Sequence, residues 1–393
     1  MPITFSIHAM LTSAVVPFLA LLTTLSIIYC ILCIYAARRF FRHVAVRRKP
    51  ARLPPVSILI PLCGVDFKAL ANYTSFCRQD YPQFQIVFGV QDPHDPSIIV
   101  VRQLMSLFPD NDLELVVSSA SLGQNPKVSN LNNMLPRAKH ECLVITDSDI
   151  RVGRDFLREI IAELSEQKVG LVTCPYRAAE VQGLPSQLES MGITGEFMPG
   201  VFVAHLIEGI TFALGAAMAT TRGTLQAIGG FQVISDYLAD DYMLGNLIHK
   251  AGFQVRLSSC VIETMSTHRG FAGMIRHQMR WARGTRICRP MSYAGYVVTH
   301  ALPLAILFVT AAGASPLSML VFSVAAVARI TMVWYVGTHL LRDAILRRSL
   351  WLLPVRDILS FFIWCSSFFG NTVEWRGKRF KIVKDGKLKP DKG

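Results

Sequence analysis

Residues 142–152 read CLVITDSDIRV, an apolar run that ends in two carboxylates, Asp147 and Asp149, one residue apart. The run is short and rich in residues that favour strands, so it predicts a buried β-strand. Packing alone does not end a strand in this way, because an ionised carboxylate is costly to bury unless something positive meets it. The two aspartates therefore indicate a site at the end of this strand.

Three further runs have the same character, and polar stretches with helical spacing separate them. They are VSILIPL (56–62), FQIVFGVQD (84–92) and LELVVSS (113–119). Strands that alternate with helices predict an α/β domain with a mainly parallel sheet, which binds ligands at the carboxyl ends of its strands. Asp92 also follows a strand, so we expect it at the same edge as Asp147 and Asp149. Neither GxGxxG nor GxxxxGK[ST] occurs, so neither a dinucleotide-binding fold nor a P-loop is supported.

The composition predicts a soluble domain joined to membrane segments. The chain has 393 residues, of which 51% are hydrophobic and 17% charged, and its mean hydropathy is +0.38. It is too apolar for an ordinary soluble enzyme. The net charge of +13 fits a partner that is an anionic membrane surface or nucleic acid. Of the nine cysteines only Cys30 and Cys33 have CxxC spacing, inside the apolar N-terminal run, and we interpret all nine as reduced thiols.

The N-terminal segment predicts a transmembrane helix. Residues 1–37 contain no charged side chain and are long enough to cross a bilayer. A cleaved signal peptide would be shorter, with a basic start and a small-residue cleavage site. Residues 38–52 then carry seven Lys or Arg and no acid, which indicates a cytoplasmic, lipid-facing collar. The collar has no aromatic interleaving, so we expect no nucleic-acid partner.

The C-terminal third predicts a second membrane region. Residues 289–341 form a transmembrane hairpin, broken at 313–316, with Arg329 facing protein or water, or reaching the interface. Residues 342–393 form a basic loop, a re-entrant or interfacial segment at 351–370, and a basic cytoplasmic tail. Between the two membrane regions lies the predicted cytoplasmic domain, residues 53–288.

The Asp-x-Asp pair has a specific chemical use. Two carboxylates at a strand end can hold Mg²⁺ or Mn²⁺, which keep other positions for substrate phosphates. Alone the pattern is weak and is also met in solvated turns. Asp240 and Asp241 add a second pair at the start of an apolar-periodic helix. They cap that helix, or one serves as a general base whose proton affinity is raised by its neighbour.

A basic segment near the second membrane region completes the pattern. Residues 276–286 read RHQMRWARGTR, with four arginines and one tryptophan. Arginine binds diphosphate in a bidentate manner, and tryptophan can stack on a sugar. A juxtamembrane basic helix is the alternative interpretation.

The order VQD, DSD, DD, RW, between an N-terminal span and a C-terminal hairpin, resembles glycosyltransferase family 21. This family includes ceramide glucosyltransferases and bacterial hopanoid-associated glycosyltransferases. The segments that carry the resemblance are 64–96, 125–152, 229–242 and 277–286. It implies a GT-A (Rossmann-like) catalytic domain with transmembrane helices at both ends. It also implies inverting transfer from a UDP-sugar to a lipid hydroxyl at the cytoplasmic membrane surface.

The resemblance also implies roles for the acidic residues. Asp92 matches the acid near the uracil and ribose, and Asp147 with Asp149 matches the pair that binds the divalent metal (Mn²⁺ or Mg²⁺) and the diphosphate. Asp241 matches the general base.

The basic and polar positions follow in the same way. Arg280 and Trp281 match the RW pair, and Lys127 and Asn130 match residues near the nucleotide. His277 stands where the family has Gln or Arg, and it can still donate a hydrogen bond to a phosphate or acceptor.

The resemblance leaves the substrates open. The segments VSNLNNMLPRA and SDIRVG favour the hopanoid group, which implies UDP-N-acetylglucosamine, a hopanoid polyol such as bacteriohopanetetrol, and the bacterial inner membrane. UDP-glucose with ceramide is the alternative.

Two further expectations leave alternatives open. Residues 200–220 line an acceptor entrance or pack in the core, and His268 lies near the metal or in an ordinary surface or core position. A processive polysaccharide synthase would need more helices after RW, and a non-catalytic scaffold would not need Asp241.

Overall fold

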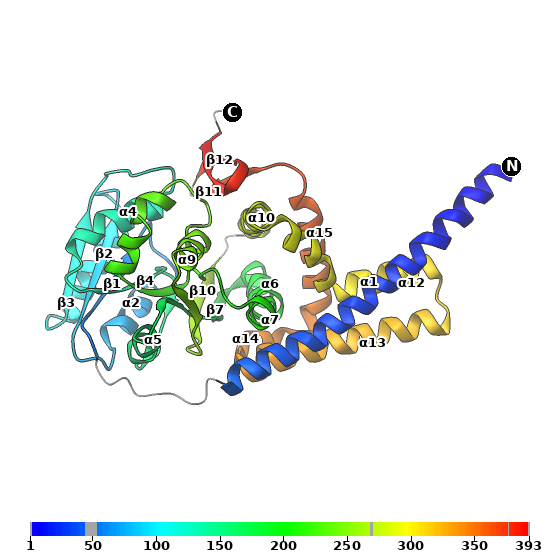
Figure 1. Ribbon diagram of the computed structural model, residues 1–393, viewed down its shortest axis with the longest axis horizontal. Coiled ribbons are helices and arrows are strands. Elements are labelled where there is room, and N and C mark those ends of the chain that lie inside the picture. The colour runs from blue at the N-terminus through cyan, green and yellow to red at the C-terminus, as the bar shows by residue number, and fades with distance from the viewer. Residues whose placement is uncertain (1, 44–52, 268–269, 376, 392–393) are drawn as a thin grey trace. The chain divides into compact units, whose positions relative to one another are not determined.

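The computed structural model describes residues 2–43, 53–267, 270–375 and 377–391 (Figure 1). Residues 44–52 of the basic collar and His268 lie outside the described residues. The chain divides into two compact units. The membrane unit consists of Met1–Arg42, Gly183–Leu206 and His268–Gly370, and the sheet unit consists of His43–Gln182, Ile207–Thr267 and Asn371–Gly393.

A seven-stranded sheet in the order β3-β2-β1-β4-β8-β6-β9 organises the sheet unit. Its strands are β1 (Val56–Pro61), β2 (Phe84–Val90), β3 (Asp112–Val117), β4 (Cys142–Thr146), β6 (Val169–Thr173), β8 (Ala217–Thr221) and β9 (Gln254–Leu257). The first four in spatial order are parallel, and β8 is antiparallel to both of its neighbours. The mainly parallel sheet predicted from the sequence is confirmed.

Every side chain of β1 is buried, because helices cover both faces of this sheet. On one face, a common apolar core joins the strands to three helices, α2 (Ala69–Cys77), α3 (Ser97–Leu107) and α5 (Phe156–Leu164). On the other face, α4 (Pro126–Met134) packs so closely on β2 that a Cβ at Gly89 would lie 2.5 Å from Oδ1 of Asn130. Glycine at this position therefore permits the contact.

The DSD segment follows the end of one strand and precedes a second strand. The run expected at 142–150 divides into β4 and the short strand β5 (Ile150–Arg151). β5 belongs to a second sheet, β5-β10-β7, with β10 (Ile262–Thr267) and β7 (Tyr176–Gln182). Because β4 and β5 belong to different sheets, the chain turns between them and presents the side chains of this turn at a sheet edge.

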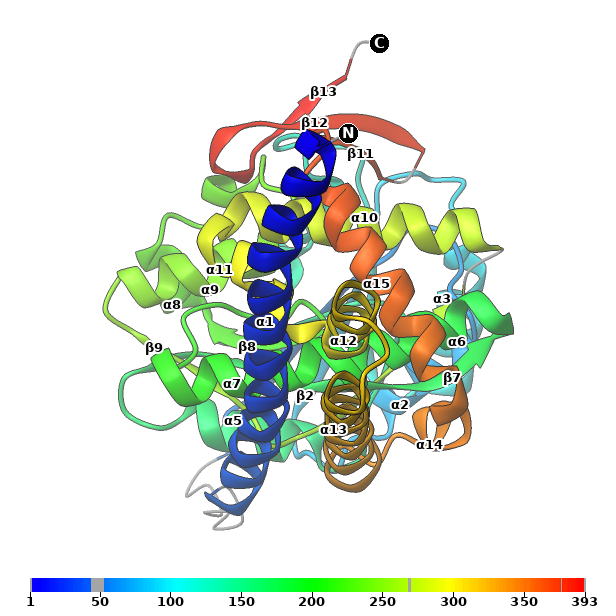
Figure 2. The ribbon, with the colours of Figure 1, turned by 90° about the vertical axis from the view of Figure 1, so that its right-hand side faces the viewer.

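The basic C-terminal tail is folded. It forms the antiparallel meander β11 (Thr372–Trp375), β12 (Lys378–Ile382) and β13 (Leu388–Pro390), drawn in red in Figure 2. The sequence predicted a cytoplasmic tail here and gave no sign of this sheet. The meander belongs to the sheet unit, so it is part of the same compact body as the DSD segment.

Among the residues that the structure describes, the membrane unit has three helical segments long and apolar enough to cross a membrane: Ala14–Arg42, Pro316–Leu340 and Ala344–Ser367. Pro290–Thr299 and Ala301–Ala312 would make a fourth only as one span bent by 66°. The sequence expectation instead counted both halves of 289–341 and treated 351–370 as re-entrant or interfacial. These candidates differ from it, and the membrane topology stays a prediction.

Several helices make up this unit, and the longest are plain in Figure 2. They are α1 (Pro2–His43), α6 (Gly183–Gly192), the π-helical turn η2 (Ile193–Phe197), most of α7 (Met198–Glu208), α10 (Phe271–Cys288), α11 (Pro290–Gly295), α12 (Ala301–Ala312), α13 (Pro316–Val333), α14 (Ala344–Ser349) and α15 (Leu353–Ser367).

Arg329 faces protein and not lipid. Its Nε and Nη2 lie 2.9 Å and 2.7 Å from the two carboxylate oxygens of Asp357, and Nη1 lies 2.7 Å from the carbonyl oxygen of Gly195. Arg356, in turn, bonds Glu196 and Gln278. These buried polar contacts tie η2 and α10 to the candidate spans. Both helices lie in segments that group with the membrane unit. The sequence analysis placed these segments in the domain 53–288, and the bounds of that domain stay a prediction.

Candidate functional site

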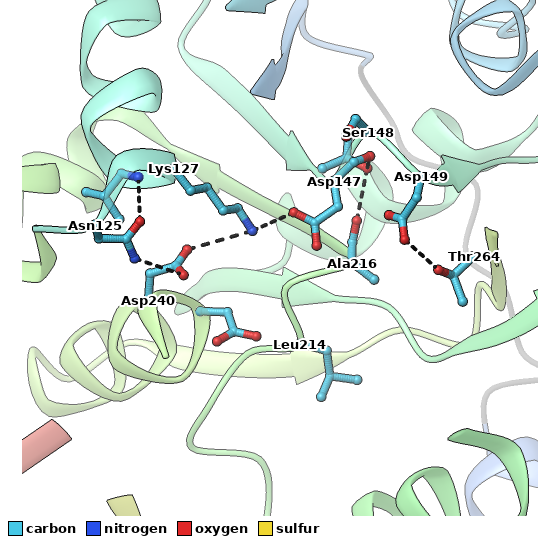
Figure 3. Close-up of polar contacts among 12 residues, drawn as sticks. Asn125, Lys127, Asp147, Ser148, Asp149, Leu214, Ala216, Asp240 and Thr264 are labelled. Carbon is cyan, nitrogen blue, oxygen red and sulfur yellow. Dashed lines mark hydrogen bonds and ion pairs between the residues drawn. The ribbon is translucent and has the colours of Figure 1, made fainter. Parts of the chain in front are cut away.

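Lys127 lies between two carboxylates that are distant in the sequence. Its Nζ is 2.6 Å from Oδ1 of Asp147 and 3.7 Å from Oδ2 of Asp240 (Figure 3). Only 12% of the Lys127 side chain is exposed. Burial opposes the charged form, but the two carboxylates raise the pKa of Lys127 above its usual value. The side chain is therefore a fixed positive charge at the end of β4.

The start of α4 positions this lysine. Asn125 caps the helix, because its Oδ1 accepts the N–H of Val128 at 3.1 Å, and Pro126 occupies the first helical turn. The Asn125 Nδ2 donates to the carbonyl of Tyr237 at 2.8 Å and to Oδ1 of Asp240 at 3.3 Å. Sequence analysis did not single out Asn125, although the Asn-Pro pair is a typical helix start.

A loop that precedes β8 anchors Asp147. The Asp147 N–H donates to the carbonyl of Ala216 at 3.2 Å, and the Thr146 hydroxyl donates to the same oxygen at 2.9 Å. The Asp147 side chain remains 40% exposed. The strand end is thus held by its backbone while the carboxylate stays accessible to a ligand.

Asp149 is held more deeply in the same turn. Its Oδ2 accepts the Thr264 hydroxyl at 3.1 Å (Figure 3). Burial, then the nearby carboxylates of Asp147 and Asp66, raise the pKa of Asp149 to about 8. The hydroxyl of Ser148, between the two aspartates, bonds Asp66. This concentration of carboxylates disfavours further negative charge and favours a cation.

The donor set fits a divalent metal that is completed by its substrate. Mg²⁺ and Mn²⁺ prefer carboxylate oxygens and often take only one or two from protein. Asp147 and Asp149 offer such oxygens from one turn. Within the described ranges, no group of three or more His, Cys, Asp or Glu side chains is placed to hold a metal.

Asp240 and Asp241 begin α9 (Asp240–Lys250), but their surroundings differ. Asp240 is buried, where its Oδ1 accepts from Asn125 and its Oδ2 forms an ion pair with the Lys127 ammonium, which it shares with Asp147. Asp241 is half-buried, and burial together with the Asp240 carboxylate raises its pKa to about 6. The two adjacent acids therefore differ: Asp240 is ion-paired, and Asp241 has an enhanced proton affinity.

Gly215 allows another segment to approach Asp241. A Cβ at Gly215 would lie 2.8 Å from Oδ2 of Asp241. Gly215 lies in the segment 200–220, whose last residues form β8 in the sheet. A role for this segment at an acceptor entrance stays a prediction.

Two predicted nucleotide contacts have other partners in the sheet unit. Asp92 lies in an exposed turn after β2, where its Oδ1 accepts the N–H of His94 at 2.9 Å. Asn130 is buried, and its Nδ2 donates to the carbonyls of Gly89 at 2.7 Å and Leu62 at 3.4 Å. These bonds join the ends of β1 and β2. The contact of either residue with a nucleotide stays a prediction.

A parallel sheet with a strand-end DxD pair, a buried lysine and a second acidic pair is a coherent polar site, and the sequence comparison agrees with it. The profile of Glycosyl transferase family 21 matches residues 18–388. The chain belongs to Glycosyl transferase family 21.

Two curated relatives of this family 21 glycosyltransferase are nematode enzymes. This chain is 22% identical to "Ceramide glucosyltransferase 3" of Caenorhabditis elegans, over 94% of its own length and 81% of that protein. It is 26% identical to "Ceramide glucosyltransferase 1" of the same organism, over 60% of the chain and 50% of that protein. Among solved structures, it resembles a mannosyltransferase from Pyrobaculum calidifontis in complex with GDP-Man and Mn²⁺. That match has 18% identity and a TM-score of 0.54, and it covers 90% of this chain and 99% of the other. It supports the GT-A fold.

The remaining predicted residues of the family 21 glycosyltransferase lie in the membrane unit, on α10. The Nδ1 of His277 is 2.5 Å from Oε1 of the buried Glu189. The His277 ring lies 4.6 Å from that of Trp281, whose side chain is exposed. Arg280 lies between these two residues on the same helix. The place of His277, Arg280 and Trp281 beside the carboxylates stays a prediction.

Proposed function

We propose that this protein is a membrane-bound inverting glycosyltransferase that moves a sugar from a UDP-sugar to a lipid hydroxyl, forming a β-glycolipid. The observation that carries the proposal is the contrast between Asp240 and Asp241. Lys127 forms an ion pair with the first carboxylate, while the second has a pKa raised to about 6. A general base works best when its pKa lies near the pH of the reaction.

Each side chain then has a part in the transfer. Asp241 accepts the proton of the lipid hydroxyl as that oxygen attacks the anomeric carbon from the face opposite UDP. The bond from this carbon to the diphosphate oxygen breaks, so an α-linked donor gives a β-glycoside. Lys127 places positive charge beside Asp147, where the diphosphate would lie. Bound by Asp147 and Asp149, Mn²⁺ or Mg²⁺ would neutralise charge on the departing UDP.

The α10 residues complete the proposal. Arg280 would bind the diphosphate, Trp281 would contact the sugar or acceptor, and His277 would donate a hydrogen bond in place of the family's Gln or Arg. Asp92 would contact the uracil and ribose. We place the catalytic residues on the cytoplasmic side of a bacterial inner membrane, because the basic residues 38–52 follow the first candidate span.

The relatives favour one substrate pair as the first to test. The named relatives are ceramide glucosyltransferases, which supports UDP-glucose and ceramide. The pairing of UDP-N-acetylglucosamine with a hopanoid polyol rests only on the sequence resemblance, and no comparison favours it.

A radiolabel transfer assay on the purified full chain with Mn²⁺ tests the function. It crosses UDP-glucose and UDP-N-acetylglucosamine with ceramide and bacteriohopanetetrol, for the wild type, Asp241→Asn and Asp110→Asn. The last variant makes the same chemical change at an exposed turn after α3. We expect a lipid-linked β-glycoside from one pairing, about 10²- to 10⁴-fold slower transfer by Asp241→Asn with nucleotide-sugar binding retained, and wild-type rates for Asp110→Asn. Wild-type transfer by Asp241→Asn would exclude it as the base, and no product from any pairing would refute the assigned acceptors.

A further inference from the structure

The C-terminal meander contacts the loop that leads into the acidic pair. This loop, residues 235–239, immediately precedes Asp240. The N–H of Leu388 donates to the carbonyl of Asp236 at 2.7 Å, and the N–H of Leu238 donates to the carbonyl of Gly386 at 3.2 Å. The outer edge of β13 thus pairs with the 235–239 loop as a short antiparallel bridge.

The opposite side of the same loop contacts the start of α4. The N–H of Asn125 donates to the carbonyl of Ser235 at 2.8 Å, and the N–H of Gln124 donates to Oδ1 of Asp236 at 2.9 Å. The Asn125 amide also reaches the carbonyl of Tyr237. The 235–239 loop is therefore held from both sides, by the segment that presents Lys127 and by the C-terminus.

The meander has its own buried apolar side chains and makes a further side-chain contact with this loop. Phe380, Ile382 and Leu388 are buried although the segment is strongly basic. The Nζ of Lys387 also lies 5.5 Å from the centre of the Tyr237 ring, which adds a cation–π contact to the bridge.

We propose that residues 386–388 are positioning residues for the acidic pair: by fixing the 235–239 loop, they hold Asp240 against Lys127 and set the place of Asp241. The inference rests on the proposed role of Asp241 as the base. This positioning role gives the basic C-terminal segment a function in the reaction, in addition to any electrostatic attraction to the lipid surface. It acts through the backbone, so composition alone cannot reveal it.

One substitution removes the main bond of this bridge and leaves the backbone bonds within the meander in place. In Leu388→Pro the donor to Asp236 is lost, while the neighbouring ladder bond from Val383 N–H to the Lys387 carbonyl remains. Proline already occupies the equivalent outward position two residues later, at Pro390. Lys387 has φ −76° and ψ 145°, a conformation that suits a residue before proline.

Leu388→Ala is the matched control. Both variants lose the leucine side chain, but only proline loses the N–H. The full chain in detergent is compared by hydrogen–deuterium exchange of peptides that cover residues 236–241. Lipid glycosylation is measured in parallel and expressed per UDP-sugar-binding site, so that a smaller folded fraction does not lower the value.

We expect Leu388→Pro to exchange faster at 236–241 than Leu388→Ala and to turn over about two- to tenfold more slowly per site, the effect of one hydrogen bond. Equal exchange and equal turnover per site in the two variants would overturn the inference. So would fewer sites with unchanged turnover per site, which indicates only a folding role. If the wild type glycosylates no lipid, the proposed function fails, and the exchange data still test the bridge.

Discussion

Gly215→Ala tests whether the position of Asp241 controls the rate. The added Cβ would lie 2.8 Å from Oδ2 of Asp241, whereas ordinary contact begins at 3.4 Å, so one group must move by about 0.6 Å. The glycine backbone is poorly able to yield. The Leu214 N–H donates to Thr173 at 2.8 Å, and the Ala216 carbonyl accepts from Asp147. We therefore expect the carboxylate to move. The backbone at Gly215 lies outside the left-handed region, so alanine adds no torsional strain there.

The expected loss in rate follows from that displacement. Misplacing a catalytic group by 1 Å can cost on the order of 10²-fold, so about 0.6 Å should slow turnover about tenfold or more. UDP-sugar binding should change little, since the three atoms nearest the added carbon all belong to Asp241. Overpacking should lower stability by about 1–3 kcal/mol.

The assay is lipid glycosylation per UDP-sugar-binding site, with Gly153→Ala as the control. Gly153 lies in the same unit, and a Cβ there meets nothing within 4 Å. Equal turnover per site in the two variants would refute the reasoning, because it would mean that Asp241 tolerates displacement or is not the base.

Two further predictions address charge. Burial and the Asp240 carboxylate raise the pKa of Asp241 to about 6, and a base acts only when deprotonated. The rate should therefore rise with pH and be half-maximal at about pH 6, and an acid limb near pH 4 would contradict this assignment. Arg329→Leu should destabilise the membrane unit by about 3–5 kcal/mol, because it leaves the buried Asp357 unpaired. Thermal unfolding in detergent measures this loss. Arg329→Leu combined with Asp357→Leu should recover much of it, and a single variant as stable as the wild type would show that the pair contributes little.

Part of the site could be predicted from local sequence because strand ends follow a simple rule. Parallel strands place their carboxyl ends at one edge, so the acids after the runs at 84–92 and 142–150 were expected at that edge. The same reasoning could not show that DSD turns between two sheets. That depends on the pairing of β5 with β10, whose residues are more than a hundred positions later.

Arg329 illustrates the same limit in the membrane unit. The sequence placed a charge in an apolar segment but left its surroundings open. The bidentate contact with Asp357 joins α13 to α15 through side chains that only the fold brings within reach, and no spacing in the sequence encodes it.

By itself, the sequence determined the alternation of strands and helices, the apolar segments at both ends and the acids at strand ends, because each depends on residues close together in the chain. Only the tertiary structure decided that Lys127 pairs with Asp147 and Asp240, leaving Asp241 with the raised pKa. It also decided that the basic C-terminus closes on the 235–239 loop. These features join residues distant in the sequence, and the energy of a charge or a backbone hydrogen bond depends on the partner that folding brings within reach.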